Sequence, residues 1–313
     1  MKIVLVGVKM AVIMVIIAAS VLGGLSQETL HGPARPVKLA EGVYYVGDLG
    51  CNVAALIGPD GVLMIDSGSV TSTDQILAAV RTVTDARIRI VIDTHFHFDH
   101  VGGNEALARK GAMILAHEQT RKKMTMPWDA KILDVQWPKI PPYPALALPS
   151  VTFPDSIKIH FNGEDIEALH IPGAHSDSDI IVRFKNANFI HAGDLFLSNG
   201  FPIIDFDSGG TIDGYLESVD KIVGLCDAET VVMPGHGPVS NREGLRSYRR
   251  MLAEAKERIM ALIKEHKTLE EILSANVTAG LYKGGESWLD PRLFVYCVYK
   301  GLQKSASSAQ SFN

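Results

Sequence analysis

The order of elements repeats along the chain, and this repetition constrains the fold more than any other feature. Residues 43–67 contain short β-rich runs separated by turn signals, and residues 71–124 then alternate helical with strand patterns. After a proline-rich stretch at 125–149, the same order begins again, with strand patterns from residue 157 and a helical pattern from residue 213. Two β-then-α halves predict an α+β fold of four layers, αββα, in which two sheets face each other and helices cover them.

The first 25 residues do not belong to this predicted fold. Lys2 and Lys9 precede the apolar run AVIMVIIAASVLGGL, which has the length of a secretory signal and is short for a membrane span. We therefore expect residues 1–25 to be a signal peptide or an N-terminal anchor, 26–38 a leader, and 39–313 one domain that ends in helices. The protein is then periplasmic or secreted, and it contacts a membrane only through an uncleaved first segment.

Charge and cysteine content exclude two classes of protein. A formal net charge of -5 lacks the basic excess with which a nucleic-acid-binding protein neutralises phosphates, so nucleic acid is not an expected partner. Three cysteines without a C-x-x-C pair are too few and too scattered for a disulfide framework. We expect Cys51, Cys226 and Cys297 to be buried as small apolar side chains.

The segment HFHFDH, residues 95–100, directly follows the apolar strand pattern IRIVID. In an extended turn that leaves a strand, His95 and His97 can converge on one metal ion, whereas on a helix they would lie on different faces. Asp99 and His100 point elsewhere in the turn and could hold a second ion or orient a bound water. Imidazole with carboxylate favours Zn²⁺, with Fe²⁺ or Mn²⁺ as alternatives. A surface turn can also collect these residue types by chance.

Three later segments share one layout, in which an apolar strand pattern ends in a glycine-bearing turn that offers a metal ligand. They are EALHIPGAH with His175, NFIHAGD with Asp194 and TVVMPGH with His236. Turns at strand ends are where α/β proteins commonly place their functional residues. Together with HFHFDH, these turns predict one metal site assembled from distant parts of the chain.

The segments HFHFDH, PGAHSDSD, AGDLF and PGHG, in this order and spacing, resemble the metallo-β-lactamase superfamily. The resemblance runs from about Val43 to about His266 and implies an αββα sandwich with metals in the cleft between the edges of the two sheets. It implies two zinc ions and seven ligands. These are His95, His97 and His175 around the first ion, Asp99, His100 and His236 around the second, and Asp194 bridging both.

The same resemblance implies an enzyme, a metal-dependent hydrolase of small molecules. Two neighbouring cations lower the pKa of a shared water to about 7, and the resulting bridging hydroxide would open a carbonyl C–N or C–O/S bond. Asp99 would hold this nucleophile in line. Asp66, at the end of VLMID, matches an aspartate that supports the ligand turn, with simple turn formation as the alternative. Asn199 is a candidate oxyanion donor by position.

Two positions bear on the substrate. Asp194 stands where well-known secreted β-lactamases of the superfamily have a cysteine, and Leu197 stands where they have a lysine that binds the drug's carboxylate. A bridging aspartate is typical of glyoxalase II-type thioesterases and lactonases. Since glutathione thioesters are cytosolic, the predicted export favours a β-lactam-like substrate, with lactonase, esterase or thioesterase activity as the alternative. A non-catalytic binding module is the remote alternative, and the intact ligand set argues against it.

Three loops are expected to shape the cleft: GPDG at 58–61, the stretch 125–149 with Trp128 and Trp137, and SNGFPIIDFDSGG at 198–210. Their aromatic side chains could clamp an apolar part of a substrate or simply pack on the sandwich.

The remaining histidines are expected to lie outside the ligand set. His117 and His191 are near strand ends beside the cleft, where support of a ligand is the alternative to a structural role. The histidines expected to be structural or solvated are His31, His160, His170 and His266.

Overall fold

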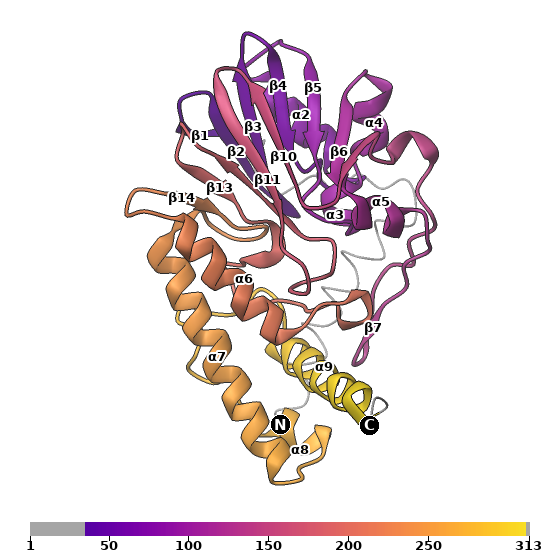
Figure 1. The fold of residues 1–313 in the computed structure, drawn as a ribbon, viewed down its shortest axis with the longest axis vertical. Coiled ribbons are helices and arrows are strands. Elements are labelled where there is room, and N and C mark those ends of the chain that lie inside the picture. Colours follow the sequence, from indigo (N-terminus) through magenta and orange to yellow (C-terminus); the bar gives the residue numbers. More distant parts are fainter. Residues whose placement is uncertain (1–34, 311–313) are drawn as a thin grey trace, which may run out of the picture.

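The computed structural model describes residues 35–310, so the predicted signal segment at 1–25 lies outside the described residues. Its first sheet contains seven strands in the order β1-β2-β3-β4-β5-β6-β9 (Figure 1). The first four strands pair antiparallel, and β4, β5, β6 and β9 pair parallel. The strands are β1 (Val37–Ala40), β2 (Val43–Leu49), β3 (Cys51–Gly58), β4 (Gly61–Ile65), β5 (Ile88–Ile92), β6 (Met113–His117) and β9 (Val151–Phe153).

The second sheet contains six strands in the order β10-β11-β12-β13-β14-β15. Its first four strands form an antiparallel meander, β14 adds parallel to β13, and β15 returns antiparallel. The strands are β10 (Ser156–Phe161), β11 (Glu164–His170), β12 (Ile180–Phe184), β13 (Phe189–His191), β14 (Val231–Met233) and β15 (Ser240–Asn241).

The helices lie along the chain between the later strands of each sheet and after the last strand. Figure 1 shows α6, α7 and α9 gathered at one end of the molecule, away from α2, α4 and α5. The helices of the first half are α2 (Thr73–Arg81), α3 (Phe98–Val101), α4 (Asn104–Arg109) and α5 (Glu118–Met124). Those of the second half are α6 (Ile212–Leu225), α7 (Arg242–Lys264), α8 (Leu269–Ser274) and α9 (Pro291–Gln310).

The side chains of β4 show how the layers are held together. Leu63 and Ile65 belong to the buried cluster between the two sheets, whereas Val62 and Met64 belong to the cluster under α2 and α4. Successive side chains of a strand point to opposite faces, so one apolar strand serves two cores. Each such fully buried side chain contributes about 1.5–3 kcal/mol. A third cluster lies between the second sheet and α6, α7 and α9, and the predicted four-layer αββα arrangement is confirmed.

Several short elements are not predicted by the sequence patterns. The proline-rich stretch contains a hairpin of two-residue strands, β7 (Lys131–Ile132) and β8 (Val135–Gln136), and β1 begins at Val37, within the expected leader. Strands this short contain too few residues for a period of two to be visible.

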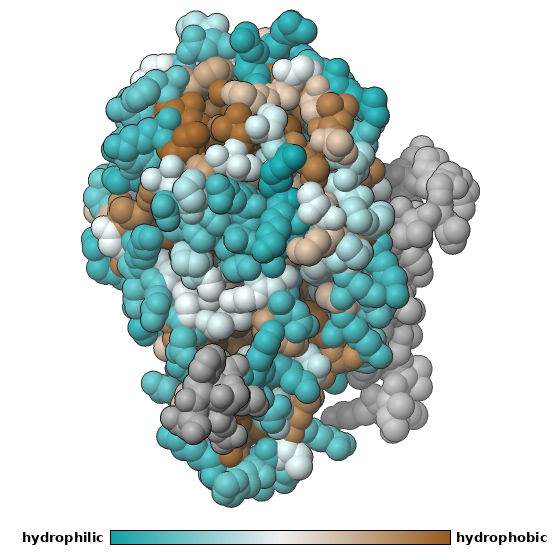
Figure 2. Space-filling model, turned by 45° about the vertical axis from the view of Figure 1, so that its right-hand side comes forward, coloured by the Kyte–Doolittle hydropathy of each residue, from teal (hydrophilic) through white to brown (hydrophobic). Residues whose placement is uncertain are grey.

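The surface is that of an ordinary globular protein. Figure 2 shows a face on which hydrophilic side chains dominate and hydrophobic ones gather mainly in its upper part. Among the described residues, no helix is both long enough and apolar enough to cross a membrane. Cys51, Cys226 and Cys297 are free and buried, as predicted.

Candidate metal centre

The seven predicted ligands lie at the ends of strands from both sheets. The segment 95–100 follows β5, and the turns that carry His175, Asp194 and His236 follow β11, β13 and β14. Because these strands end at the same edge of the sandwich, the fold brings together side chains separated by more than a hundred residues. The local turns differ, since His97 caps the four-residue helix α3 and Asp194 lies in a single turn of 3-10 helix.

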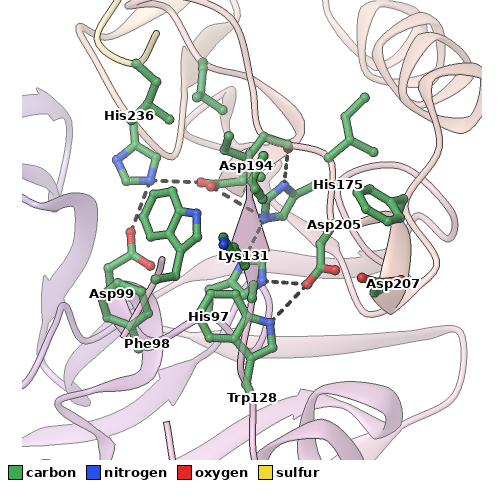
Figure 3. A pocket seen from close by; sticks show the side chains of 18 of the residues that line it. His97, Phe98, Asp99, Trp128, Lys131, His175, Asp194, Asp205, Asp207 and His236 are labelled. Carbon is green, nitrogen blue, oxygen red and sulfur yellow. Dashed lines mark hydrogen bonds and ion pairs between the residues drawn. The ribbon is translucent and has the colours of Figure 1, made fainter. Parts of the chain in front are cut away.

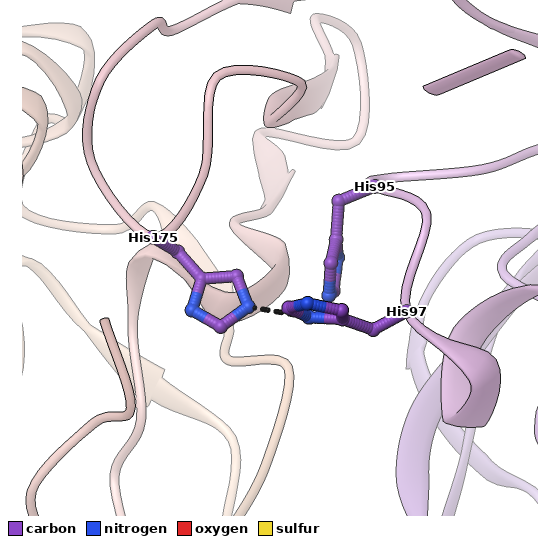
Figure 4. A group of neighbouring side chains, drawn as sticks. All are labelled: His95, His97 and His175. Atoms are coloured by element: carbon purple, nitrogen blue, oxygen red, sulfur yellow. Dashed lines mark hydrogen bonds between the residues drawn. The ribbon is translucent and has the colours of Figure 1, made fainter. Parts of the chain in front are cut away.

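Three of the ligands form a buried cluster of rings that we call the imidazole group: His95, His97 and His175. Nε2 of His175 lies 2.8 Å from Nδ1 of His97, and the ring of His95 lies with its centroid 4.9 Å from each of the other two. Figure 4 shows the three rings converging from two separate loops. Nε2 of His95 is buried without a hydrogen-bond partner. A buried nitrogen without a partner is costly unless something else binds it.

Three further ligands form what we call the carboxylate-bearing group: Asp99, His100 and His236. Nε2 of His236 lies 3.4 Å from Oδ2 of Asp99, and Nε2 of His100 lies 3.6 Å from the same oxygen. The two imidazole nitrogens are 3.4 Å apart. The Asp99 side chain keeps 22% of its surface exposed, so this group opens toward solvent.

Asp194 lies between the two groups. Its Oδ1 is 3.2 Å from Nε2 of His100 and 3.4 Å from Nε2 of His236, while its Oδ2 is 3.7 Å from Nε2 of His175 (Figure 3). Gly235 is required here because a Cβ atom at this position would collide with the carboxylate of Asp194. One carboxylate thus faces both groups.

Each imidazole has an acceptor on the nitrogen that faces away from the cluster. A ring that donates its outer N–H leaves a lone pair on the inner nitrogen, which is the form that binds a metal. The outer contacts are His97 Nε2 to Asp205 Oδ2 at 3.1 Å, His100 Nδ1 to Asp66 Oδ2 at 2.7 Å, His175 Nδ1 to the carbonyl of Ile203 at 2.8 Å, His236 Nδ1 to the carbonyl of Gly50 at 2.7 Å and His95 Nδ1 to Thr94 Oγ1 at 3.0 Å.

The donor set fits a metal. His95, His97 and His175 form one group of possible ligands, His95, His100 and Asp194 a second, and Asp99, His100 and His236 a third, with the ligand atoms of each within 4.8 Å of one another. Zinc bonded tetrahedrally at about 2.0 Å requires donors about 3.3 Å apart. The separations in the carboxylate-bearing group are close to this value. Imidazole and carboxylate are also donors that zinc, iron and manganese accept.

The two groups differ in their electrostatics. Burial, and then the neighbouring His97 ring, lower the pKa of His175 to about 4, and burial lowers the pKa of His95 well below its usual value. Burial alone would also lower the pKa of His236, but the carboxylates of Asp194 and Asp99 outweigh it and raise that pKa to about 9. His95 and His175 are therefore neutral near pH 7, whereas His236 in the carboxylate-bearing group is protonated.

Two buried aspartates hold the ligand rings from outside. Asp66 accepts hydrogen bonds from the N–H and the hydroxyl of Thr94 at 2.7 and 2.9 Å as well as contacting His100. Its backbone has a φ of 63°, in the left-handed region, so Asp66 also stands at a turn of the backbone. Asp205 contacts His97 and accepts a hydrogen bond at 3.3 Å from Nε1 of Trp128. Sequence reasoning missed Asp205, which lies in a loop without a motif.

Asn52 is a second residue that the sequence reasoning missed. Its side chain donates to the carbonyls of Pro234 at 2.9 Å and Gly237 at 2.8 Å, on both sides of His236. Nothing in the run CNVAALIG marks this asparagine, because its partners are more than 180 residues away. It fixes the turn that presents His236.

The two histidines near strand ends differ in their surroundings. His191 accepts a hydrogen bond from the N–H of Gly193 at 3.1 Å, so it supports the turn of Asp194. His117 stacks on His170 with 3.5 Å between ring centroids and contacts the carbonyl of Pro154. These contacts of His117 are structural.

The remaining two histidines of the described chain are solvated or terminal. His160 is exposed and pairs with Asp165, and His266 lies beyond the end of α7. His31 lies outside the described residues.

A cavity opens over the metal centre, lined by parts of 128–137 and 203–207 (Figure 3). The expectation that GPDG at 58–61 shapes the cleft is wrong. The turn lies at the start of β4, whereas Asp66, which supports the ligand His100, lies at the end of β4. The length of the strand therefore separates the turn from the site, and none of its residues lines the cavity. Asn199 is not among the lining residues either. Its carbonyl accepts a hydrogen bond from the N–H of Trp288, which does line the cavity.

The family model described as the metallo-beta-lactamase superfamily matches residues 46–236, which is more than half of the chain. This chain belongs to the metallo-beta-lactamase superfamily. The matched part begins in β2 and ends at His236, so it contains every residue of the donor set. The members of this superfamily are metal-dependent hydrolases, and the buried His and Asp side chains of this chain could hold a metal.

Individual relatives of this superfamily member are distant. A metallo-beta-lactamase type 2 of Bacteroides fragilis is 24% identical over 197 residues, or 60% of this chain and 72% of that protein. An acyl-coenzyme A thioesterase of Bos taurus is 25% identical, and the match covers 50% of this chain and 59% of that protein, less than two thirds of its length. A solved metallo-beta-lactamase from Pontibacter korlensis has a TM-score of 0.57 at 18% identity and covers 70% of this chain and 99% of that chain, which shows a common fold.

Proposed function

We propose that the protein is a hydrolase that binds two zinc ions, one in the imidazole group and one in the carboxylate-bearing group, with Asp194 between them. Its reaction is the opening of a carbonyl C–N, C–O or C–S bond, with a β-lactam-like amide as the first candidate. The observation that carries the proposal is the convergence of inward-facing imidazole nitrogens, each with its outer nitrogen occupied, on Asp194. Iron or manganese would suit the same donors.

Two ions bound here would acidify a shared water and polarise the substrate carbonyl. Asp99 lies at the open side of the donor set and lines the cavity. Burial alone would raise the pKa of Asp99, but His100 and His236 outweigh it and lower that pKa to about 2. Its carboxylate therefore stays ionised at neutral pH, which allows it to accept a hydrogen bond from the attacking water and to hold that water in line.

A second candidate function is hydrolysis of an ester, lactone or thioester. Leu197 is buried and lines the cavity, so this position offers no cation to the carboxylate of a β-lactam. The thioesterase among the relatives supports this candidate, as the Bacteroides enzyme supports the first. A purely binding role is disfavoured because a site without chemistry has no need of a complete donor set.

A substrate panel tests both candidates. Purified, zinc-loaded protein is assayed against a chromogenic cephalosporin, an acyl-homoserine lactone and an acyl thioester. Hydrolysis of at least one, lost in Asp99→Ala and kept in Asp85→Ala, supports the proposal, because Asp85 is an exposed carboxylate away from the cavity. Absence of hydrolysis on the whole panel, or full activity of Asp99→Ala, would contradict it.

We also propose export, on the basis of the apolar segment in residues 1–25. In cells that express the full chain, the protein is then expected in the periplasm or the medium, or attached to the membrane through that segment. Fractionation and the mass of the mature N-terminus check this. A full-length chain found only in the soluble cytoplasm would contradict export.

A further inference from the structure

All three tryptophans of the chain line the cavity over the metal centre: Trp128, Trp137 and Trp288. They come from two regions that are far apart in the sequence. Trp128 and Trp137 lie in the proline-rich stretch, whereas Trp288 lies just before α9. Such a concentration of large apolar rings beside polar ligands is the usual composition of a small-molecule site.

Trp128 flanks the imidazole group. Its ring centroid lies 5.3 Å from that of His97, and its Nε1 donates to the same carboxylate of Asp205 that holds His97. Figure 3 shows Trp128, Asp205 and His97 joined in this way. The ring is therefore fixed in place before any substrate arrives.

Trp288 flanks the carboxylate-bearing group. Its ring stacks on His236 with centroids 4.4 Å apart and an angle of 21° between the planes. Its backbone N–H donates to the carbonyl of Asn199, and the hydroxyl of the neighbouring Ser287 accepts from the N–H of Phe201 at 3.3 Å. The part of the chain around Trp288 is thus tied to the loop that leads away from Asp194.

Although it is held on both sides, Trp288 keeps 47% of its surface exposed, and it is one of the few large apolar side chains of the described chain to do so. It also lies beyond residue 236, where the match to the superfamily ends. An exposed ring that is fixed next to a catalytic centre is an apolar surface available to a ligand.

Charged groups on the wall do not favour an anion. Asp205 and Asp207 line the cavity together with Ile203, Ile204 and Phe206, and Lys131 is the one lysine or arginine among the lining residues. An anionic group entering along this wall would meet two carboxylates. An uncharged apolar group would instead contact aromatic and branched side chains.

We propose that Trp128 and Trp288 bind an uncharged apolar acyl group of the substrate, and that Trp288, which lies beyond the residues matched by the family model, determines specificity for that group. The substrate then carries a medium-length alkyl or aryl acyl chain, which favours the second candidate class, an ester, lactone or thioester, over the first. The expected effect on ester selectivity rests on the proposed hydrolase function. The expected binding of the apolar group does not, because binding requires no turnover.

The first test measures binding with the zinc-loaded full chain. Since every tryptophan lines the cavity, intrinsic tryptophan emission reports on this site alone among the described residues. The uncharged, unreactive ketone 2-decanone is expected to change the emission saturably, and Trp288→Ala to weaken its binding about tenfold. Leu146→Ala is the matched control, because Leu146 is an exposed apolar residue of the same proline-rich stretch and does not line the cavity; it is expected to bind as the wild type does.

The second test measures selectivity with p-nitrophenyl octanoate and p-nitrophenyl acetate. The ratio of kcat/KM for the two esters is expected to favour octanoate, to fall about tenfold in Trp288→Ala and to recover in Trp288→Phe, which restores a flat ring. Equal ketone binding by Trp288→Ala and Leu146→Ala, or an unchanged ratio, would overturn the inference. Ketone binding that depends on Trp288 without hydrolysis of either ester would keep the inference and count against the hydrolase proposal.

Discussion

The two halves of the metal centre are built from similar side chains but differ in charge. The imidazole group contains no carboxylate, and burial together with the neighbouring rings lowers the pKa of His175 and of His95, so that these two rings are neutral. In the carboxylate-bearing group, Asp99 and the adjacent Asp194 raise the pKa of His236 above its usual value. A metal ion can bind the neutral rings of His175 and His95 directly, whereas it must displace the proton of His236 in the second group. Two ions should therefore bind with different strength and different dependence on pH.

Removing the carboxylate that faces both groups should have the largest effect on activity. Asp194→Asn takes away the one carboxylate that faces both groups, and we expect kcat/KM on any substrate found in the panel to fall more than about a thousandfold. Steady-state kinetics with zinc-loaded protein measure the effect. Asp85→Asn, an exposed carboxylate, serves as the control, and a loss smaller than tenfold would show that Asp194 does not bridge.

The pH dependence of metal binding should separate the two groups. His236 stays protonated in the metal-free protein up to its pKa of about 9, and zinc must displace that proton, so zinc affinity of the carboxylate-bearing group should rise with pH. The expected rise is about a hundredfold between pH 6.5 and 8.5 for one proton released. His175, with a pKa of about 4, releases no proton over that range, so the zinc affinity of the imidazole group should depend less on pH.

Calorimetric titrations with zinc in buffers of different ionisation enthalpy measure the protons released by each ion. Equal proton release from the two sites would contradict the assignment. The stability of the metal-free protein should change with pH in the opposite direction to zinc affinity. The raised pKa of His236 contributes folding stability that is fully present below the usual pKa of histidine and is lost as the pH rises through about 9.

The buried aspartates should allow each group to be weakened separately. Asp205→Asn removes the carboxylate behind His97, and Asp66→Asn removes the one behind His100. Asp205→Asn should lower zinc affinity of the imidazole group about 10- to 100-fold and leave the carboxylate-bearing group almost unchanged. Asp66→Asn should lower zinc affinity of the carboxylate-bearing group by a similar factor, with a smaller effect on the imidazole group, because Asp66 also holds Thr94, which contacts His95. Competition with a chromophoric chelator resolves the two affinities. If both variants weakened the same ion, the division into two groups would be wrong.

Asn199 should show the smallest effect. Because it does not line the cavity, Asn199→Ala is expected to change kcat less than about threefold, far below the loss of an oxyanion donor. Measuring kcat and KM separately checks this. A loss of a hundredfold in kcat alone would restore Asn199 as an oxyanion donor.

The sequence predicted the residues that lie in local patterns and missed those whose partners are distant. The strands β3, β4, β5 and β11 are visible as apolar runs. The ligands are visible as the crowded segment HFHFDH after one such run and as the glycine-bearing turns of His175, Asp194 and His236 after others, and the structure brings these side chains together. Two-residue strands such as β15 show no period.

Asp205, Asn52 and Trp288 could not be predicted for a different reason. Asp205 meets His97 across 108 residues, Asn52 meets Gly237 across 185, and Trp288 stacks on His236 from beyond the residues 46–236 that the family model matches. No local pattern encodes such contacts, since they exist only after the sheets and loops have packed.

The central claim is that one buried donor set holds two ions in unlike surroundings. A crystal of zinc-loaded protein grown at about pH 8.5, with anomalous data collected at the zinc edge, tests it most directly. The account predicts two peaks, one about 2 Å from nitrogens of the imidazole group and one about 2 Å from atoms of the carboxylate-bearing group, with Asp194 between them. No peak within this donor set, or zinc bound only elsewhere on the chain, would contradict it.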